Sequence, residues 1–403
     1  MNTIADVLNG KPRDSCAVII PSDGLKISYG NLQLEVERLA AVLTGYGLER
    51  GRSVSIILPN GFEFITLFLS VITAGAVAAP LNPAYAEDEF EFYIQDSDSQ
   101  LVVVPPGPHL GRDAASKLGV PIIECSLDIN EVNLSTSNGL LSALRDPELP
   151  VLNDVALFLH TSGTTSRPKA VPLRHSNLIA SIGNIADTYK LTPEDIAMVV
   201  MPLFHVHGLI GVLLSTFFSG GTVVVPDRFS AGKFWPLQKE TRATWYSAVP
   251  TIHQVLLMRA ESDMAPDKSF RFIRSCSSAL APSVFENLED RFGAPVLEAY
   301  GMTEASHQMT SSPLPEHGER YSGTVGRPTG VDISVMSMDT TGEMLATDQT
   351  GEIVIRGPNV MHGYNNNPQA NKESFVDGWF RTGDQGFIDK SGYLSLTGRI
   401  KEL

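Results

Sequence analysis

The chain has 403 residues, of which 43% are hydrophobic and 19% charged, and its formal net charge at pH 7 is −15. This composition is typical of a globular protein with more than one structural unit and excludes a disordered chain. The acidic balance argues against binding of nucleic acid or an anionic membrane through charge alone. The three cysteines are far apart and lack metal-site spacing, so we predict reduced thiols without a catalytic role.

The first 150 residues alternate short apolar runs with amphipathic stretches, as a layered α/β unit would. We predict strands at residues 17–21, 53–58 and 101–104 and a helix at 32–46, and we interpret the polar stretch 130–138 as an exposed connector. Residues 64–79 are uncharged and nearly long enough to span a membrane, but hydroxyl residues and Gly75 interrupt them. We interpret them as a buried helix packed against a sheet and expect no stable membrane insertion. No secretory signal is visible at the N-terminus.

The α/β pattern continues over residues 151–310, with short strands predicted at 155–159, 198–201 and 222–225. Residues 311–397 are rich in glycine and carry four short β-like runs, at 334–336, 352–356, 386–388 and 393–396. This spacing predicts a small β-barrel or curled sheet.

The most informative stretch is T-S-G-T-T-S-R-P-K at residues 161–169, directly after a buried strand. Hydroxyl groups and backbone N–H groups around a glycine can bind phosphate oxygens, and Lys169 offsets their charge. A plain surface loop is the alternative interpretation, since these are also turn residues. The second glycine of a Walker loop is absent, and no G-x-G-x-x-G follows a strand, so neither of those nucleotide sites is expected.

This run resembles the signature of the acyl-adenylate-forming enzymes, which include acyl-CoA synthetases, luciferases and adenylation domains. Three more motifs of the family follow in the family's order: Y-G-M-T-E at 300–304, T-G-D at 382–384 and G-R-I-K-E-L at 398–403. The resemblance covers nearly the whole chain. It implies an α/β fold, the large N-terminal domain of these enzymes, with two layered α/β subdomains (1–150 and 151–310) and a small β-barrel subdomain (311–397).

The last motif marks the hinge of the family, with Lys401 at the hinge position. In relatives a smaller C-terminal domain follows it and brings a catalytic lysine. We expect residues 398–403 to be the start of this hinge and the C-terminal domain to be absent from this chain. The chain as given would then bind ATP and the acid but adenylate poorly.

The resemblance implies a site for ATP and Mg²⁺, with CoA as co-substrate. Glu304 would coordinate Mg²⁺, Thr303 would contact the α-phosphate, Asp384 the ribose hydroxyls, Arg399 the ribose or phosphate, and Tyr300 would stack on adenine. Lys169, Thr303 and Glu304 would be catalytic, together with His205 near the acid and the α-phosphate. The remaining nucleotide contacts would be Thr161, Ser162, Gly163, Thr164, Thr165, Ser278, Ala279, Glu298, Ala299 and Gly301.

Several stretches look specifically like the oxalate–CoA ligases of plants and fungi, among them P-L-F-H-V-H-G-L at 202–209 and R-F-I-R-S-C-S at 271–277. Oxalate would then contact Ser277, His307 and one or both of His205 and His207. Polar contacts of this kind suit a short acid whose second carboxylate must not be left unpaired. The sequence departs from these enzymes at Gly301, where they carry alanine, and at Ala170.

Two alternatives remain from the sequence. One is a ligase for medium-chain fatty or 4-coumarate-like acids, which would favour a deep apolar acyl pocket. The other is a nucleotide-binding module that kept the fold and lost turnover. We expect a cytoplasmic location, or a peroxisomal one if a C-terminal targeting tripeptide follows the last residue given.

Overall fold

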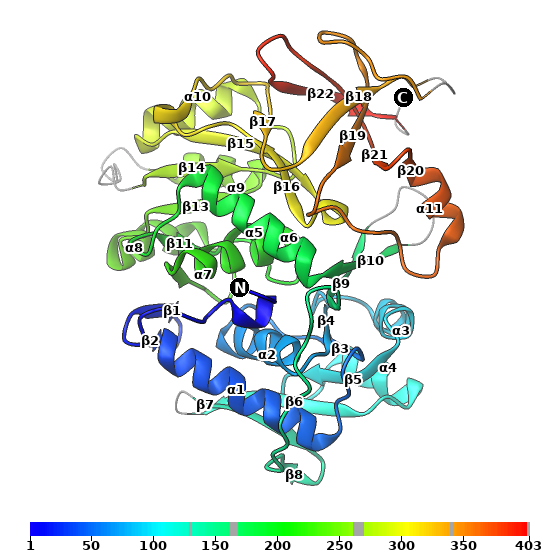
Figure 1. Ribbon diagram of the computed structural model, residues 1–403. Coiled ribbons are helices and arrows are strands. Elements are labelled where there is room, and N and C mark those ends of the chain that lie inside the picture. Colours follow the sequence, from blue (N-terminus) through cyan, green and yellow to red (C-terminus); the bar gives the residue numbers. More distant parts are fainter. Residues whose placement is uncertain (129–130, 162–167, 261–269, 339–341, 401–403) are drawn as a thin grey trace.

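The computed structural model describes residues 1–403 except 129–130, 162–167, 261–269, 339–341 and 401–403. Three β-sheets organise these residues, and helices cover the two larger sheets (Figure 1). The N-terminal third forms the lower part of the molecule in this view. The last sheet lies at the opposite end.

The first sheet has eight strands in the order β10-β9-β4-β3-β5-β6-β7-β8. Neighbours from β9 to β6 run parallel, whereas β10, β7 and β8 pair antiparallel. Its strands are β3 (Ser53–Ile56), β4 (Val77–Pro80), β5 (Ser99–Val104), β6 (Ile122–Asp128), β7 (Glu131–Thr136), β8 (Gly139–Leu140), β9 (Val155–Thr161) and β10 (Lys169–Arg174). The helices of this part are α1 (Tyr29–Tyr46), α2 (Phe62–Thr73), α3 (Glu87–Asp96) and α4 (Leu110–Leu118).

Local sequence explains where the first long helix begins and ends. The Ser28 side chain accepts a hydrogen bond from the backbone N–H of Asn31, which caps the start of α1. At the other end Gly47 has φ +110°, a left-handed conformation that glycine adopts without strain and that commonly ends a helix. The apolar face of α1 packs against α2 within the main hydrophobic core.

The second sheet has nine strands in the order β17-β16-β15-β14-β13-β11-β12-β1-β2. They are β1 (Cys16–Ile20), β2 (Leu25–Ser28), β11 (Ile196–Met198), β12 (Thr222–Val224), β13 (Trp245–Ala248), β14 (Phe272–Ser275), β15 (Val296–Met302), β16 (His307–Ser311) and β17 (Arg327–Pro328). Its helices are α5 (His175–Tyr189), α6 (Val206–Gly208), the π-helical segment η2 (Leu209–Leu214), α7 (Ser215–Ser219), α8 (Ala231–Thr241), α9 (Pro250–Arg259) and α10 (Pro282–Phe292).

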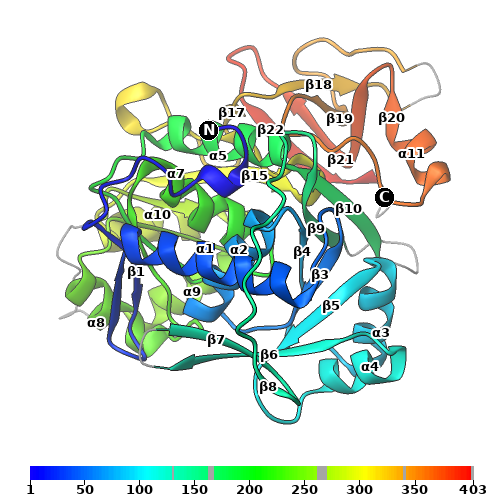
Figure 2. The same cartoon turned by 60° about the horizontal axis from the view of Figure 1, so that its bottom comes forward.

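The third sheet is smaller and antiparallel. It consists of β18 (Asp332–Met336), β19 (Gly351–Arg356), β20 (Phe375–Val376), β21 (Trp379–Ile388) and β22 (Leu394–Arg399), with the helix α11 (Pro368–Ser374) beside it. This part projects from one side of the molecule in Figure 2. The short elements that remain are η1 (Ile4–Asp6), η3 (Thr303–Ala305) and η4 (Pro315–His317).

The two larger sheets interleave the segments 1–150 and 151–310. Strand β1 pairs with β12, so the N-terminal hairpin belongs to the second sheet, whereas β9 pairs with β4 and joins the first. Strand pairing across residue 150 ties the two segments together. Whether residues 1–150 and 151–310 form separate subdomains remains a prediction.

Two local interpretations of the sequence need correction. The polar stretch 130–138 is not a connector, because β7 pairs with β6 and its Val132 and Leu134 are buried while the residues between them are more exposed. The apolar stretch 64–79 is a helix only as far as Thr73, after which Gly75 at φ +74° turns the chain into β4. Over the residues described, none of the helices combines the length and the apolarity that crossing a membrane requires.

Candidate active site

The predicted phosphate loop joins two adjacent antiparallel strands. Thr161 ends β9, Lys169 begins β10, and the two residues are register partners. Ser162, Gly163, Thr164 and Thr165 lie outside the described residues. The described part of this site therefore consists of the two ends of the loop and the side chains around Lys169.

Lys169 and Glu304 meet through a tyrosine. The Lys169 Nζ lies 4.7 Å from the centre of the Tyr364 ring, and the Tyr364 hydroxyl donates a hydrogen bond to Glu304 Oε1 at 2.8 Å. Backbone bonds hold this region together, because Met361 N–H donates to the Glu304 carbonyl and Asn365 N–H donates to the Ala170 carbonyl. The structure thus brings the loop lysine and the motif glutamate to one place.

Burial sets the electrostatics of this carboxylate. Glu304 is only 6% exposed, and burial raises its pKa, whereas the hydrogen bond from Tyr364 and the charge of Lys169 lower it. Among the described residues no group of three or more His, Cys, Asp or Glu side chains could hold a metal ion. A single buried carboxylate does fit Mg²⁺ when nucleotide oxygens and water complete the coordination.

A second meeting point joins motifs 84 positions apart in the sequence. The Tyr300 hydroxyl donates to Asp384 Oδ2 at 2.5 Å, and Arg399 Nε lies 3.2 Å from Asp384 Oδ1. Asp384 and Arg399 are register partners on β21 and β22, so the sheet itself sets this ion pair. A carboxylate has further acceptor positions on both oxygens, so Asp384 can still accept hydrogen bonds from ribose hydroxyls.

The other predicted nucleotide residues lie on neighbouring segments. Glu298 and Ala299 are buried in β15, and Thr303 begins η3 directly after it, while Ser278 and Ala279 are exposed in the segment after β14. Burial raises the pKa of Glu298 to about 7, although Gly323 N–H donates to its carboxylate. Their roles toward a nucleotide stay predictions.

Three of the predicted acid contacts come together. The two nitrogens of His207 lie at hydrogen-bond distance from two serine hydroxyls: Nδ1 is 3.0 Å from Ser277 Oγ, and Nε2 is 2.7 Å from Ser247 Oγ. The His207 and His307 rings stack with their centres 5.3 Å apart. Both histidines are almost completely buried, whereas Ser277 is exposed. The site is therefore polar both at its surface and in depth.

His205 stands apart from these three. It is exposed and caps α6, where its Nδ1 accepts a hydrogen bond from the His207 backbone N–H at 3.3 Å. This contact orients the start of the helix that carries His207. A direct role of His205 at the acid remains a prediction.

The backbone around His307 is under strain. Ser306 and His307 have φ values of +51° and +98°, a region that residues with side chains rarely adopt and that clusters at functional sites. A Cβ at Gly301 would lie 2.0 Å from the His307 carbonyl oxygen. The absence of a side chain at Gly301 is therefore what allows the turn that bears His307 to lie against β15.

Sequence reasoning missed two residues of this site. Tyr364 links Lys169 to Glu304, and nothing in its local sequence distinguishes it from a core tyrosine. Arg274 is fully buried on β14, and its guanidinium contacts Ser247 and His307. An arginine inside the apolar strand F-I-R-S was the signal that could have revealed it.

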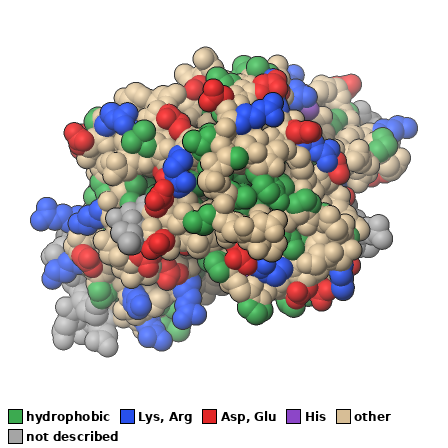
Figure 3. All heavy atoms as spheres, turned by 90° about the horizontal axis from the view of Figure 1, so that it is seen from below, with side chains coloured by type: hydrophobic (Ala, Val, Ile, Leu, Met, Phe, Trp, Pro, Cys, Tyr) green, Lys and Arg blue, Asp and Glu red, His purple; other side chains and the backbone are tan. Residues whose placement is uncertain are grey.

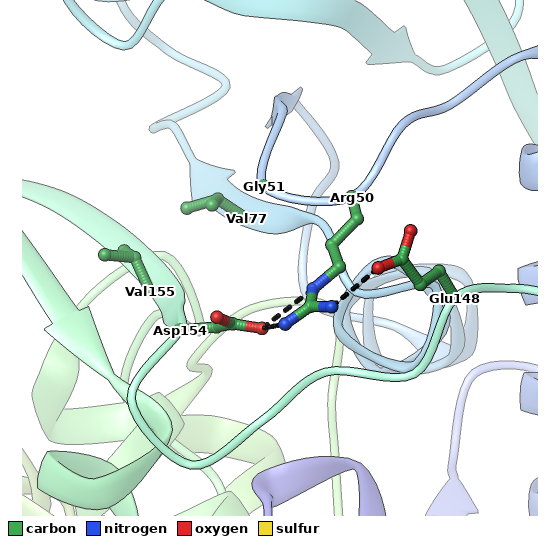
Figure 4. Close-up of a pocket in the computed structure, with 6 residues that line it drawn as sticks. All are labelled: Arg50, Gly51, Val77, Glu148, Asp154 and Val155. Atoms are coloured by element: carbon green, nitrogen blue, oxygen red, sulfur yellow. Dashed lines mark hydrogen bonds and ion pairs between the residues drawn. The ribbon is translucent and has the colours of Figure 1, made fainter.

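One depression lies away from the motif residues. A depression lined by Arg50, Gly51, Val77, Glu148, Asp154 and Val155 contains none of the motif residues, and Figure 4 shows its guanidinium held between two carboxylates. On the face seen in Figure 3, acidic and basic side chains are interspersed. Neither feature points to a second nucleotide site.

A fold with Lys169, Glu304 and Asp384 gathered in this way is that of an adenylate-forming enzyme. The profile of the AMP-binding enzyme family matches residues 5–365, and the chain belongs to this family. The motif-based recognition and the fold class are thereby confirmed.

Similar proteins narrow the class. The oxalate–CoA ligase of Arabidopsis thaliana is 48% identical over 390 residues, which cover 95% of this chain and 76% of that protein. The oxalate–CoA ligase of Saccharomyces cerevisiae is 46% identical over 423 residues, covering 97% and 77%. The structure of ATP-bound MatB from Rhodopseudomonas palustris has a TM-score of 0.88 at 32% identity and covers 100% of this chain and 80% of MatB. These comparisons support an AMP-forming acid–CoA ligase, a class whose substrates include ATP and CoA.

Proposed function

We propose that the protein is an oxalate–CoA ligase. One oxalate carboxylate attacks the α-phosphorus of ATP and pyrophosphate leaves, which gives an oxalyl-adenylate. The CoA thiolate then attacks the acyl carbon and AMP leaves, which gives the thioester. The observation that carries the proposal is the polar arrangement of His207, Ser277 and His307, where a fatty or aromatic acid would need apolar contacts.

In this reaction the motif residues bind different parts of the nucleotide. Lys169 and the loop after Thr161 bind the β- and γ-phosphates, Thr303 contacts the α-phosphate, and Asp384 holds the ribose. Glu304 would hold Mg²⁺ together with nucleotide oxygens, and the ion when bound offsets the negative charge of the phosphates. Lys169 begins β10, Asp384 lies in β21, and Thr303 and Glu304 lie in η3 directly after β15, so the fold holds these side chains in place before any ligand arrives.

The relatives support the same choice of acid. Two of the similar proteins are named oxalate–CoA ligases, and each match covers at least 95% of this chain. We place the protein in the cytoplasm or the peroxisome, where a ligase for a small dicarboxylic acid has access to ATP and CoA.

The test is acid-dependent CoA-thioester formation by the protein with oxalate, malonate, octanoate or 4-coumarate, at saturating ATP and Mg²⁺. We expect oxalate to give the highest kcat/KM. Calorimetric titration of oxalate in the presence of a non-hydrolysable ATP analogue measures the binding step alone.

The alternatives give different results. A preference for octanoate or 4-coumarate would leave an acid–CoA ligase and overturn oxalate as its substrate. A chain that binds ATP and forms no thioester with any acid would favour the nucleotide-binding module.

A further inference from the structure

Arg274 is a buried cation to which the described residues supply no anion. Its side chain is 0% exposed, and its hydrogen-bond partners are all neutral: Tyr189, Ser247, His307 and Gln308. Across the described part of the chain no carboxylate lies within ion-pair distance of it. A buried charge without an opposite charge is costly, so its retention calls for a reason.

A neighbouring arginine shows how a partly buried guanidinium is ordinarily neutralised. Arg271 lies three residues earlier at the edge of the same strand, and its guanidinium binds both oxygens of Asp195, at 3.0 and 2.9 Å. The two arginines come from one short segment and differ in their counter-charge. Arg271 is neutralised within the protein, whereas Arg274 is left to a group that the protein does not provide.

The arginine fixes the direction of a chain of hydrogen bonds. Arginine can only donate, so the Ser247 hydroxyl accepts from Arg274 Nη1 at 3.1 Å. Ser247 is fully buried, and the only acceptor for its own hydrogen among its described partners is His207 Nε2 at 2.7 Å. If His207 donated to Ser247 instead, the hydroxyl hydrogen of Ser247 would be buried without an acceptor, which is unfavourable.

The direction continues to the accessible end of the chain. With Nε2 accepting, neutral His207 carries its proton on Nδ1 and donates to Ser277 Oγ at 3.0 Å. Ser277 therefore keeps its own hydrogen available, and its side chain is exposed. The buried charge of Arg274 thus makes the Ser277 hydroxyl a hydrogen-bond donor toward a ligand.

His307 follows the same rule. Its Nε2 lies 2.9 Å from Arg274 Nη2 and must accept, so its proton is on Nδ1, for which no described residue serves as acceptor. The contact depends on Gly211 in the π-helical segment η2, since a Cβ there would lie 2.4 Å from His307 Nε2. π-Helical turns often occur at functional sites, and this one leaves room for the contact between Arg274 and His307.

We propose that Arg274 is the specificity-determining positioning residue of the acid site. It orients Ser277 and His307 as hydrogen-bond donors through Ser247 and His207, and its charge is balanced by the second carboxylate of a short dianionic acid. We call Ser247, Arg274, Ser277, His207 and His307 the acid-end cluster. This inference rests on the proposed function and names the group that selects the substrate class.

Selection among acids follows from the groups that an unsuitable acid would leave unpaired. A dianionic acid brings the missing negative charge and acceptors for both donors. An acid with an alkyl or aryl tail brings neither, so the cation and the donors stay unpaired, and such sites reject the wrong ligand strongly.

The first experiment replaces Arg274 with methionine, which has similar length and no charge. We expect Arg274→Met to raise the KM for oxalate about 100-fold, as loss of a buried charge partner does, with the KM for ATP unchanged. Arg274→Lys keeps the charge and loses the planar fork, so it should recover part of the oxalate affinity. An unchanged KM for oxalate in Arg274→Met would overturn the proposal.

The second experiment measures the direction of the hydrogen bonds from Arg274 to the two histidines in the absence of substrate. It therefore tests the proposal even if oxalate is the wrong acid. Nitrogen-15 chemical shifts of the labelled histidines, assigned with His207→Gln and His307→Gln, should place the proton of both histidines on Nδ1 in the free protein. In Ser247→Ala the proton of His207, but not that of His307, should no longer be confined to Nδ1. In Gly211→Ala the same change should occur at His307. Protons found on Nε2 of both histidines in the unchanged protein would overturn the relay.

Arg271→Met is the matched control. It removes an arginine of the same segment and leaves Asp195 unpaired, so it should lower the unfolding temperature without changing the KM for oxalate or the histidine tautomers. If it raised the KM for oxalate as much as Arg274→Met does, the effect of Arg274 would be structural and the proposal would fall.

Discussion

The two ends of the site handle charge in opposite ways. At the nucleotide end two carboxylates are buried: Glu304 accepts from Tyr364 near Lys169, and Asp384 accepts from Tyr300 beside Arg399. At the acid end the buried charge is a single cation, Arg274, among neutral side chains. Each end thus carries the group that its proposed ligand needs. The carboxylates suit Mg²⁺ and ribose hydroxyls, and the guanidinium suits an anion.

The comparison teaches that burial alone does not identify a functional charge. Arg271 and Arg381 also lie partly buried, but each is paired with a buried carboxylate of the protein. What distinguishes the acid end is that the described residues leave its charge unbalanced. The following predictions test whether the two ends are separate in this sense.

The largest effect is expected from Glu304→Gln. The amide keeps the shape and can still accept from Tyr364, but it loses the charge that would hold Mg²⁺, so oxalate-dependent exchange of pyrophosphate into ATP should fall about 1,000-fold. Calorimetric titration should show unchanged oxalate binding. Exchange within tenfold of the unchanged protein would remove Glu304 from the nucleotide end.

A smaller effect is expected from Asp384→Asn. The amide can accept from Tyr300 but holds the ribose and Arg399 more weakly, so the KM for ATP should rise about 10- to 100-fold, with a smaller change in kcat. Steady-state kinetics at saturating oxalate measures this. An equal rise in the KM for oxalate would show that the two ends are not independent.

Glu298 predicts a pH dependence of stability. No described cation pairs with this buried carboxyl group, and burial raises its pKa to about 7 from an ordinary value of 4.5. The folded state then holds its proton where the unfolded state has lost it, so the free energy of unfolding falls as the pH rises from 4.5 to 7 and levels off above that.

Glu298→Gln should remove this fall and stabilise the protein at pH 8 by up to roughly 3 kcal/mol. Urea denaturation at pH 5, 6, 7 and 8 compares the two proteins. A parallel pH dependence in both would mean that Glu298 ionises normally in the folded chain.

The smallest effect is expected from Arg50→Met in the depression of Figure 4. Its ion pairs with Glu148 and Asp154 are partly exposed and screened by solvent, so their loss should lower the stability only slightly, and less at high salt. The KM values for ATP and oxalate should not change. A change in either would connect this depression to the site.

The sequence predicted the nucleotide end better than the acid end for a physical reason. The chemistry of phosphates and ribose is carried by short runs such as residues 300–304 and 382–384, so each run can be recognised by itself. Their meeting, through Tyr300 and Asp384, joins a strand of the second sheet to a strand of the third, which no local pattern contains. The strands predicted at 53–58 and 101–104 correspond to β3 (Ser53–Ile56) and β5 (Ser99–Val104), short strands that are almost entirely buried.

The acid end could be predicted only in part. His207, Ser277 and His307 were expected there, but Ser247 and Arg274 lie on strands whose apolar neighbours conceal them. Their importance depends on which partners surround them, and those partners come from five separate elements, α5, α6, β13, β14 and β16. The prediction for the segment 130–138 was wrong for a related reason. Val132 and Leu134 are too few apolar residues to indicate a strand within a polar run, and only the pairing of β7 with β6 defines the strand.

The close approach of Gly301 to the His307 carbonyl has a further consequence. Strand β15 carries Tyr300 of the nucleotide end, and β16, its antiparallel neighbour, begins with His307 of the acid end. Any shift of this two-stranded ribbon on binding of one ligand moves the contact that the other requires. Linkage between two binding sites is reciprocal, so the factor by which bound ATP changes the affinity for the acid through this ribbon is also the factor by which bound acid changes the affinity for ATP. The independence expected of the variants above corresponds to a factor close to one.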